Sequence, residues 1–204
     1  MDRRDIQALF SEHQACLNSK PRQLSFDRFA IESSTNLSVD RHTDDLKTMR
    51  KTMQFILTSL DVDDVFPRIS SAARELAQGE CGLLMINDHH GQLWVQSASY
   101  DDPDVNSRVR EKLALRAGRL AIDSRRILIS RDIHSDPRII QSRHYRQTGV
   151  QSLVCVPMIT KNNVIGAIYA DSRESGAASI IDNQAQLLFL ADITAMSLEN
   201  IRLY

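Results

Sequence analysis

The sequence is poor in glycine, contains few cysteines and lacks any long run of apolar residues. Only seven of its 204 residues are glycine, and none belongs to a Gly-rich phosphate loop or a Gly-x-Ser-x-Gly nucleophile elbow. Its longest apolar stretches fall well short of the roughly 20 residues that span a bilayer. The charged start, MDRRDIQALFSEHQ, lacks the apolar core of a signal peptide. From these absences we expect a cytoplasmic protein. Its net charge of only -1 gives no general attraction to nucleic acid or membranes, so we expect it to bind neither.

The three cysteines, Cys16, Cys81 and Cys155, are too few and too far apart for a disulfide framework or a paired metal-binding motif. Cys81 and Cys155 fall in apolar, strand-like runs, where a buried and reduced thiol is the simplest interpretation. The chain also lacks a His-Glu-x-x-His motif. We therefore predict no catalytic residue, no metal site and no cofactor.

What is present is the composition of an ordinary globular domain, with 42% hydrophobic and 25% charged residues. The spacing of the apolar residues divides the chain into three parts. Residues 1–43 contain a short amphipathic helix and a connector, and residues 44–60 form a lead-in helix of the coiled-coil type. Residues 61–204 form the main domain, which ends in a long helix from about residue 182.

Two of the predicted helices carry apolar residues at alternating intervals of three and four, the spacing of a coiled-coil seam. In the lead-in helix the seam consists of Leu46, Met49, Met53, Ile56 and Leu60. In the C-terminal helix it consists of Leu187, Ala191, Thr194, Leu198 and Ile201. We take these residues as candidate dimer contacts. The alternative is that each helix packs its seam on its own domain.

Between these two helices, helical and strand-like patterns alternate. Helices are predicted from about residue 64 to 78, with Gly79 as the stop signal, and from 104 to 122, with an interruption near Ala117-Gly118. The stretches CGLLMIND, QLWVQSAS and ILIS are predicted strands. SLVCVPMITKNNVIGAIYADS predicts two longer strands joined by a turn at Thr160–Asn163. Because both alternating sets of side chains in the first of these strands are apolar, we expect it to be buried on both faces.

Several of these stretches, taken in order, resemble GAF domains. LTSLDVDDVFPRISSAARELAQGECGLLMIND is similar to the opening helix and first strand of that family. LAIDSRRILISRDIHSDPRI resembles its middle segment, in which a short strand leads to Asp132 and then to Asp136-Pro137-Arg138. GVQSLVCVPMITKNNVIGAIYADS and IDNQAQLLFLADITAMSLENIRLY resemble its last two strands and exit helix. The resemblance covers residues 60–204 and is to GAF domains of bacterial signalling proteins, upstream of cyclase, phosphatase, phosphodiesterase or enhancer-dependent activator outputs.

The resemblance implies an α/β (α+β) fold with a central antiparallel sheet of about five to six strands. Terminal helices would pack on one face of this sheet. Helices and loops would cover the other face, which commonly holds a small-molecule pocket in this family. The fold leaves the function open, so the function must be argued from a site.

The sequence departs from three functional branches of the family. Covalent bilin binding uses a cysteine near a histidine, and no such Cys-His pair occurs here. Cyclic-nucleotide binding goes with an Asn-Lys…Phe…Asp-Glu signature, but no lysine follows Asn162 or Asn163, and Ile180-Ile181-Asp182-Asn183 stands where the rest is expected. Free methionine sulfoxide reduction needs a nucleophilic and a resolving thiol. Cys81 and Cys155 do not match the clustered cysteines of that branch.

Residues 104–146 are strongly basic, with eleven Arg or Lys against five Asp or Glu. The resemblance places this segment in the cover of the pocket, where an inward-pointing arginine could bind an anion through paired hydrogen bonds. Arg138 is the leading candidate because it lies in the Asp-Pro-Arg loop. The candidate ligand-binding set is Arg138, Asp132, His134, Tyr145 and Ser130. The simpler alternative is a solvated surface, or an internal pair between Arg138 and Asp136 or Asp132.

These observations favour a non-enzymatic sensory or regulatory GAF domain. It would bind a small, anionic ligand or a partner, form a homodimer and pass a signal through its C-terminal helix to an output domain outside these 204 residues. Two alternatives stay open. One is a cysteine-dependent free methionine sulfoxide reductase of the GAF type, and the other is a structural dimerisation module without a ligand.

Overall fold

The computed structural model describes most of the predicted main domain. The described residues are 47, 50, 51, 54, 56, 62–88, 90–102, 107–139, 148–161, 163–173 and 183–203. All of them belong to one compact unit, Ser38–Tyr204. The helix and connector predicted for residues 1–43 lie outside the described residues. Within the described ranges, no helix is both long and apolar enough to cross a membrane.

The described part of the chain contains a five-stranded sheet with the order β2-β1-β5-β4-β3. The strands are β1 (Cys81–Asn87), β2 (Leu93–Tyr100), β3 (Leu128–Ser130), β4 (Ser152–Ile159) and β5 (Val164–Ser172). Every neighbouring pair is antiparallel. The long hairpin predicted around the Thr160–Asn163 turn therefore forms β4 and β5, and β5 is the central strand.

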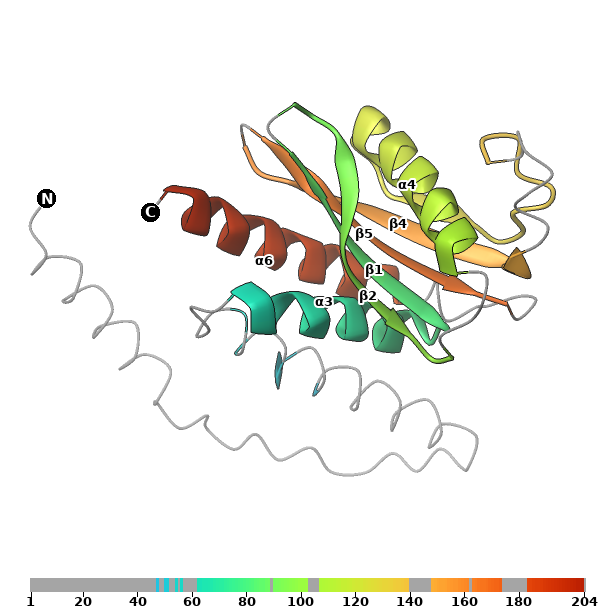
Figure 1. Ribbon diagram of the computed structural model, residues 1–204, viewed down its shortest axis with the longest axis horizontal. Helices are drawn as coiled ribbons and strands as arrows, with labels where there is room; N and C mark the ends of the chain where they lie inside the picture. The colour runs from blue at the N-terminus through green and yellow to red at the C-terminus, as the bar shows by residue number, and fades with distance from the viewer. Residues whose placement is uncertain are drawn as a thin grey trace, which may run out of the picture. The chain divides into compact units, whose positions relative to one another are not determined.

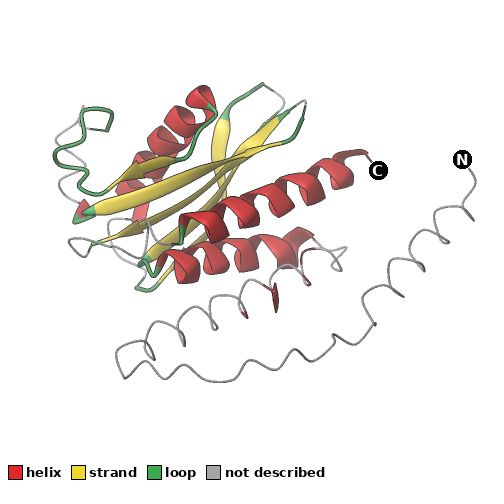
Figure 2. Ribbon diagram, turned by 180° about the vertical axis from the view of Figure 1, so that it is seen from behind, coloured by secondary structure: helices red, strands yellow, loops and turns green. Residues whose placement is uncertain are grey.

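Helices cover both faces of the sheet. Helices α3 (Val62–Ala77) and α6 (Gln184–Leu203) lie side by side on one face, and α4 (Ser107–Ser124) lies on the other (Figure 1). The view from behind shows the same three layers (Figure 2). The buried apolar residues accordingly form two clusters, one under each layer of helices. The predicted α+β fold, with terminal helices on one face and a helical cover on the other, is confirmed.

Strand β4 has the double-sided burial that its sequence predicts. Val154, Val156 and Met158 belong to the cluster under α3 and α6. Leu153 and Cys155 belong to the cluster under α4. Successive strand residues point to opposite faces, so a strand that is apolar on both faces must lie between two covering layers.

The end of α3 differs from the prediction in one residue. Gln78, not Gly79, adopts the left-handed conformation, with φ of 50°. The Gln78 and Gly79 N–H groups donate to the carbonyls of Glu75 and Arg74, the bonding pattern of a Schellman cap. Gly79 is needed for another reason: a Cβ there would lie 2.3 Å from the carbonyl oxygen of Asp171. The glycine thus allows the end of α3 to approach the backbone at the C-terminal end of β5.

The interruption predicted near Ala117-Gly118 is wrong, since α4 continues through both residues. Glycine is unfavourable inside a helix by about 1 kcal/mol, but this one lies where α4 meets the sheet. A Cβ on Gly118 would lie 2.6 Å from Leu93 Cδ2 and 2.9 Å from Met85 Cε. Close packing of the helix against β1 and β2 therefore accounts for the glycine.

The candidate dimer seam on α6 faces the domain's own core, which favours the alternative that this helix packs its seam on its own domain. Leu187, Ala191 and Leu198 belong to the cluster under α3 and α6, and Thr194 is fully buried. Ile56 of the lead-in seam joins the same cluster. The remaining seam positions lie outside the described side chains: Leu46, Met49, Met53, Leu60 and Ile201. The physical reason is that this stripe of α6 is the one that covers the sheet.

Candidate functional site

A single arginine enters the interior of the domain from α4. The inner stripe of this helix is otherwise formed by small or apolar residues: Leu113, Ala114, Ala117, Gly118 and Ala121. Arg110 lies on the same stripe, one turn earlier, and only 1% of it is exposed. A buried guanidinium requires acceptors, because an unpaired buried charge is strongly destabilising.

Asp171 of β5 supplies these acceptors and is itself fully buried. The Arg110 Nε–H donates to Asp171 Oδ2 over 3.4 Å, and Arg110 Nη2 donates to Asp171 Oδ1. The Tyr169 hydroxyl donates to the same Oδ2 over 2.8 Å. The ion pair is therefore two-pronged and uses one edge of the guanidinium.

Asp171 binds only two of the three guanidinium nitrogens of Arg110, Nε and Nη2. Within the described residues no acceptor binds the Nη1 group. The face of the guanidinium lies against the Tyr100 ring, with 5.9 Å from the Arg110 Cζ to the ring centroid. The Tyr100 hydroxyl in turn donates to Glu111 Oε1 over 3.4 Å. Arg110 is thus held by Asp171 and by the Tyr100 ring, and its Nη1 donors remain available for another acceptor.

The sheet presents this site as a transverse row of side chains. Cys81 pairs with Tyr100 on one side and with Asp171 on the other, and Leu153 connects Asp171 to Ser130. Residues paired across strands point to the same face, so all five side chains face α4. We call Arg110, Asp171, Tyr169, Tyr100, Glu111 and Cys81 the Arg110 cluster.

Burial dominates the protonation chemistry of the cluster. It raises the pKa of the Asp171 carboxyl, while hydrogen bonds from Arg110 and Tyr169 oppose that rise by favouring the charged form. Burial, with the nearby Asp171 charge, also raises the pKa of the Cys81 thiol and of the Tyr169 hydroxyl. The cluster therefore holds one buried ion pair beside a thiol and a phenol that burial keeps un-ionised.

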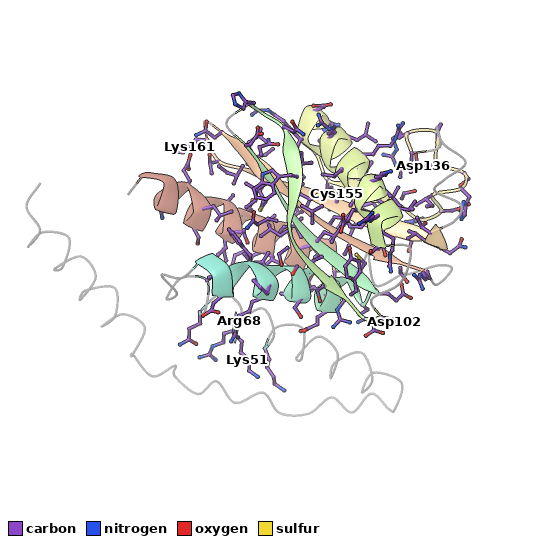
Figure 3. The ribbon with its side chains drawn as sticks, viewed as in Figure 1. Lys51, Arg68, Asp102, Asp136, Cys155 and Lys161 are labelled. Atoms are coloured by element: carbon purple, nitrogen blue, oxygen red, sulfur yellow. The ribbon has the colours of Figure 1, made fainter. Side chains whose placement is uncertain are left out.

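Both described cysteines are ill suited to nucleophilic chemistry. Cys155 is fully buried under α4 (Figure 3), and burial raises the pKa of its thiol. Cys81 has the same shift, and both thiols are free. Because the thiolate is the reactive form, these residues act as packed side chains. Across the described ranges, no three His, Cys, Asp or Glu residues gather as a metal site would require.

The predicted ligand set lies elsewhere, in the loop after β3. Arg138 donates to Asp136 Oδ1 over 2.9 Å and to Asp136 Oδ2 over 2.6 Å, and it also donates to the Ile129 carbonyl over 2.8 Å. The Arg138 side chain is 51% exposed. The Arg138 hydrogen bonds lower the pKa of Asp136 to about 2. This is the internal pair named as the simpler alternative, and it fastens the loop to β3.

The other members of that set are dispersed. The His134 N–H donates to Asp132 Oδ1 over 2.9 Å, and this bond lowers the pKa of Asp132. Ser130 is buried at the end of β3, in the transverse row that contains Asp171. Tyr145 lies outside the described residues. Ligand binding by this set stays a prediction, and only Ser130 among its described members shares the face of the Arg110 cluster.

The sequence contains a signal for the Arg110 cluster, although a count of basic residues hides it. Arg110 is one of the eleven bases of residues 104–146, yet it lies three, four, seven and eleven residues before the apolar members of its helix stripe. Asp171 likewise follows Ala167 and Tyr169 at intervals of two in an apolar strand. A basic residue on an apolar helix face and an acidic residue at an inward strand position are candidates for a buried pair.

The family comparison supports the same fold. The model of the GAF domain family matches residues 59–199. None of the curated proteins compared matches the chain.

Solved structures show a similar fold at low sequence identity. The GAF domain of a phosphoenolpyruvate-protein phosphotransferase from Coxiella burnetii is 14% identical, with a TM-score of 0.59 over 79% of this chain and 96% of that one. A free methionine-R-sulfoxide reductase from Neisseria meningitidis is 13% identical, with a TM-score of 0.58 over 88% and 99%. The chromophore-binding domain of a bacteriophytochrome from R. palustris is 12% identical, with a TM-score of 0.59 over 84% and 64%.

Proposed function

Because the chain belongs to the GAF domain family, we propose that it is a non-enzymatic regulatory domain, which binds a small anionic ligand beside Arg110 and passes the change to α6. The observation that carries this proposal is Arg110, whose side chain is 1% exposed, whose Nε and Nη2 bind Asp171, and whose Nη1 has no acceptor within the described residues. The Nη1 donors are therefore available to a ligand that reaches the cluster. A carboxylate or phosphate oxygen is the acceptor that a guanidinium binds best.

The surroundings of Arg110 favour an anion. Residues 107–139, which form α4, β3 and the following loop, contain nine basic and four acidic residues. Arg108, Lys112 and Arg119 lie outside the buried stripe of α4. Their combined positive potential raises the local concentration of small anions.

The main alternative is a free methionine sulfoxide reductase, since two structural relatives carry that name. Burial of Cys81 and Cys155 and the raised pKa of both thiols speak against it. An assay of free methionine sulfoxide reduction decides the matter. Turnover that is lost in Cys81→Ser or Cys155→Ser would establish the reductase and overturn the proposal.

A thermal-shift screen tests the ligand proposal. The probes are small carboxylates, inorganic phosphate and nucleoside monophosphates. A ligand at 100 times its Kd stabilises the folded state by about 2.7 kcal/mol, which raises the Tm measurably. Arg110→Lys keeps a charge for Asp171 but loses the forked donors, so we expect affinity to fall at least tenfold. The matched control, Arg138→Lys, should leave affinity unchanged.

Two results would contradict the ligand proposal. If no probe shifts the Tm and native mass spectrometry shows no retained small molecule, the ligandless dimerisation module is the better description. If a probe binds equally well to the wild type and to Arg110→Lys, the binding site lies away from the cluster.

We also propose that the domain forms a homodimer through the outer stripe of α6. Of the large apolar residues that are exposed in the described part of the chain, three of four lie on this helix: Leu188, Phe189 and Met196. Met196→Lys should shift sedimentation equilibrium toward the monomer, because it places a charge in an apolar interface. Asn200→Lys, at an exposed polar position of the same helix, is the control. A monomer at high concentration for the wild type would end this part of the proposal.

A further inference from the structure

The start of α6 is connected to α4 by hydrogen bonds that cross the fold. We infer that Arg110, Asp171, Glu80, Gly79, Leu76 and Asn183 form a conformational relay, in which the packing of α4 on the sheet sets the stability of the first turns of α6. The relay passes from α4 through the end of β5 and the end of α3 to the residue before α6.

The first link joins α4 to β5 through the Arg110–Asp171 ion pair. Both side chains are buried, with at most 1% exposed. A buried carboxylate that loses its partner must be protonated, move or remain at high free energy. A displacement of Arg110 therefore acts directly on Asp171.

The second link joins Asp171 to the end of α3 through the backbone. The Glu80 N–H donates to the Asp171 carbonyl over 3.1 Å. The same carbonyl lies so close to Gly79 that a Cβ there would be 2.3 Å away. The Glu80 carboxylate also accepts the Arg173 N–H over 2.6 Å. The backbone at Asp171 thus has little room to move without displacing residues 79 and 80.

The third link joins α3 to α6 through Asn183, which is 2% exposed. Asn183 Nδ2 donates over 2.7 Å to the carbonyl of Leu76, one of the last carbonyls of α3, which lack a partner within the helix. The Asn183 carbonyl accepts the Leu187 N–H over 3.1 Å, the first bond of α6. One residue therefore completes the end of α3 and begins α6.

The far end of α6 is held by a separate attachment. Glu199 Oε1 accepts the Thr160 hydroxyl over 2.8 Å and Asn163 Nδ2 over 3.2 Å, both from the β4–β5 turn. These bonds have no member in common with the relay. Glu199 consequently offers a control that disturbs α6 without disturbing the Asp171 junction.

The role of the relay in signalling rests on the proposed regulatory function. The coupling between α4 and α6 itself can be measured without any ligand. Coupling between two sites is reciprocal in free energy. If the opening of α6 depends on the Arg110–Asp171 pair, the opening of α4 must therefore depend on Asn183, although the two substitutions need not have effects of equal size. Failure of the ligand screen would remove the proposed ligand, and failure of reciprocity would remove the relay.

Native-state hydrogen exchange tests the relay, because it measures the local opening of each helix. In Asp171→Asn we expect amides at 187–191 of α6 to exchange at least tenfold faster, beyond any change in β4, whose amides report global unfolding. In Asn183→Ala we expect faster exchange at 113–117 of α4, again at least several-fold. If Asp171→Asn does not fold, Tyr169→Phe removes a single hydrogen bond to Asp171 and should give the same pattern with a smaller factor.

Two controls separate coupling from general destabilisation. Asp136→Asn breaks the other ion pair on the α4 side and should leave exchange at 187–191 unchanged. Glu199→Gln should accelerate exchange at the end of α6 and leave α4 unchanged. The relay would be overturned by equal acceleration in β4 and α6, or by an Asn183→Ala variant in which α4 exchanges like the wild type.

Discussion

Replacing Arg110 by methionine should produce a destabilisation that depends strongly on pH. The substitution preserves most of the side-chain volume but leaves Asp171 buried with the Tyr169 hydroxyl as its remaining donor. Removing one partner of a buried ion pair typically destabilises by about 3–5 kcal/mol. The carboxyl can avoid the full penalty by binding a proton, which sets an upper limit on the loss.

That upper limit on the destabilisation follows from the pKa of the Asp171 carboxyl in the unfolded chain. An unfolded aspartate has a pKa of about 3.9, so protonating it at pH 7 requires about 4 kcal/mol, and at pH 5 about 1.5 kcal/mol. In Arg110→Met the folded-state pKa of Asp171 lies above the unfolded value, because burial raises it and Arg110 no longer opposes the rise. A raised folded-state pKa means that stability decreases as the pH rises from about 4 through the folded value. The penalty should therefore shrink by about 2–3 kcal/mol between pH 7 and pH 5.

Urea unfolding followed by circular dichroism at 222 nm, from pH 5 to pH 8, measures this effect. The double variant Arg110→Met/Asp171→Asn contains no buried charge at either position and should be more stable at pH 7 than Arg110→Met alone. The difference in free energy of unfolding between the double variant and the wild type should therefore lack the pH dependence expected for Arg110→Met. A single-variant penalty that is constant from pH 5 to pH 8 would refute the reasoning, as would a double variant less stable than either single variant.

Three further predictions concern other parts of the fold. The Asp136–Arg138 pair should contribute about 1 kcal/mol to the free energy of unfolding. This contribution is complete above pH 4 and is lost as the pH falls toward the Asp136 pKa of about 2. Asp136→Asn should therefore flatten the acid side of a curve of stability against pH. Gly118→Ala should lower the free energy of unfolding by about 1–3 kcal/mol despite its better helix propensity, because its methyl group meets Met85 and Leu93; an increase in the urea midpoint would contradict that account. In a Cys16→Ser background, Cys81 and Cys155 should react with a disulfide reagent only after unfolding, and rapid labelling of the folded protein would show that the thiols are accessible.

The order of helices and strands was predictable because it depends on local periodicity. A continuous apolar run of strand length marked β4, and spacing of three and four marked the inner stripe of α6. Burial of β4 on both faces followed from the same pattern. The predicted break at Gly118 failed because a propensity describes an isolated helix, whereas the close approach of α4 to β1 and β2 determines which residue fits there.

The partner of an apolar stripe was not predictable in the same way. The spacing of Leu187, Ala191 and Leu198 states that these residues share one face of a helix. It does not state whether that face meets another copy or the domain's own sheet. The structure assigns the stripe to the sheet, and the proposed dimer contact moves to Leu188, Phe189 and Met196.

The sequence alone determined the GAF family, the α+β class and the central hairpin, because each depends on patterns within short stretches of chain. Only the tertiary structure brought the residues of the candidate site together. Arg110 and Asp171 are 61 residues apart, and only the antiparallel pairing of β5 with β1 and the packing of α4 bring them together. The same packing made Arg138 a partner of its own loop and Arg110 the buried cation. The role of a charged side chain depends on its exposure to solvent and on its partners, and the whole fold determines both.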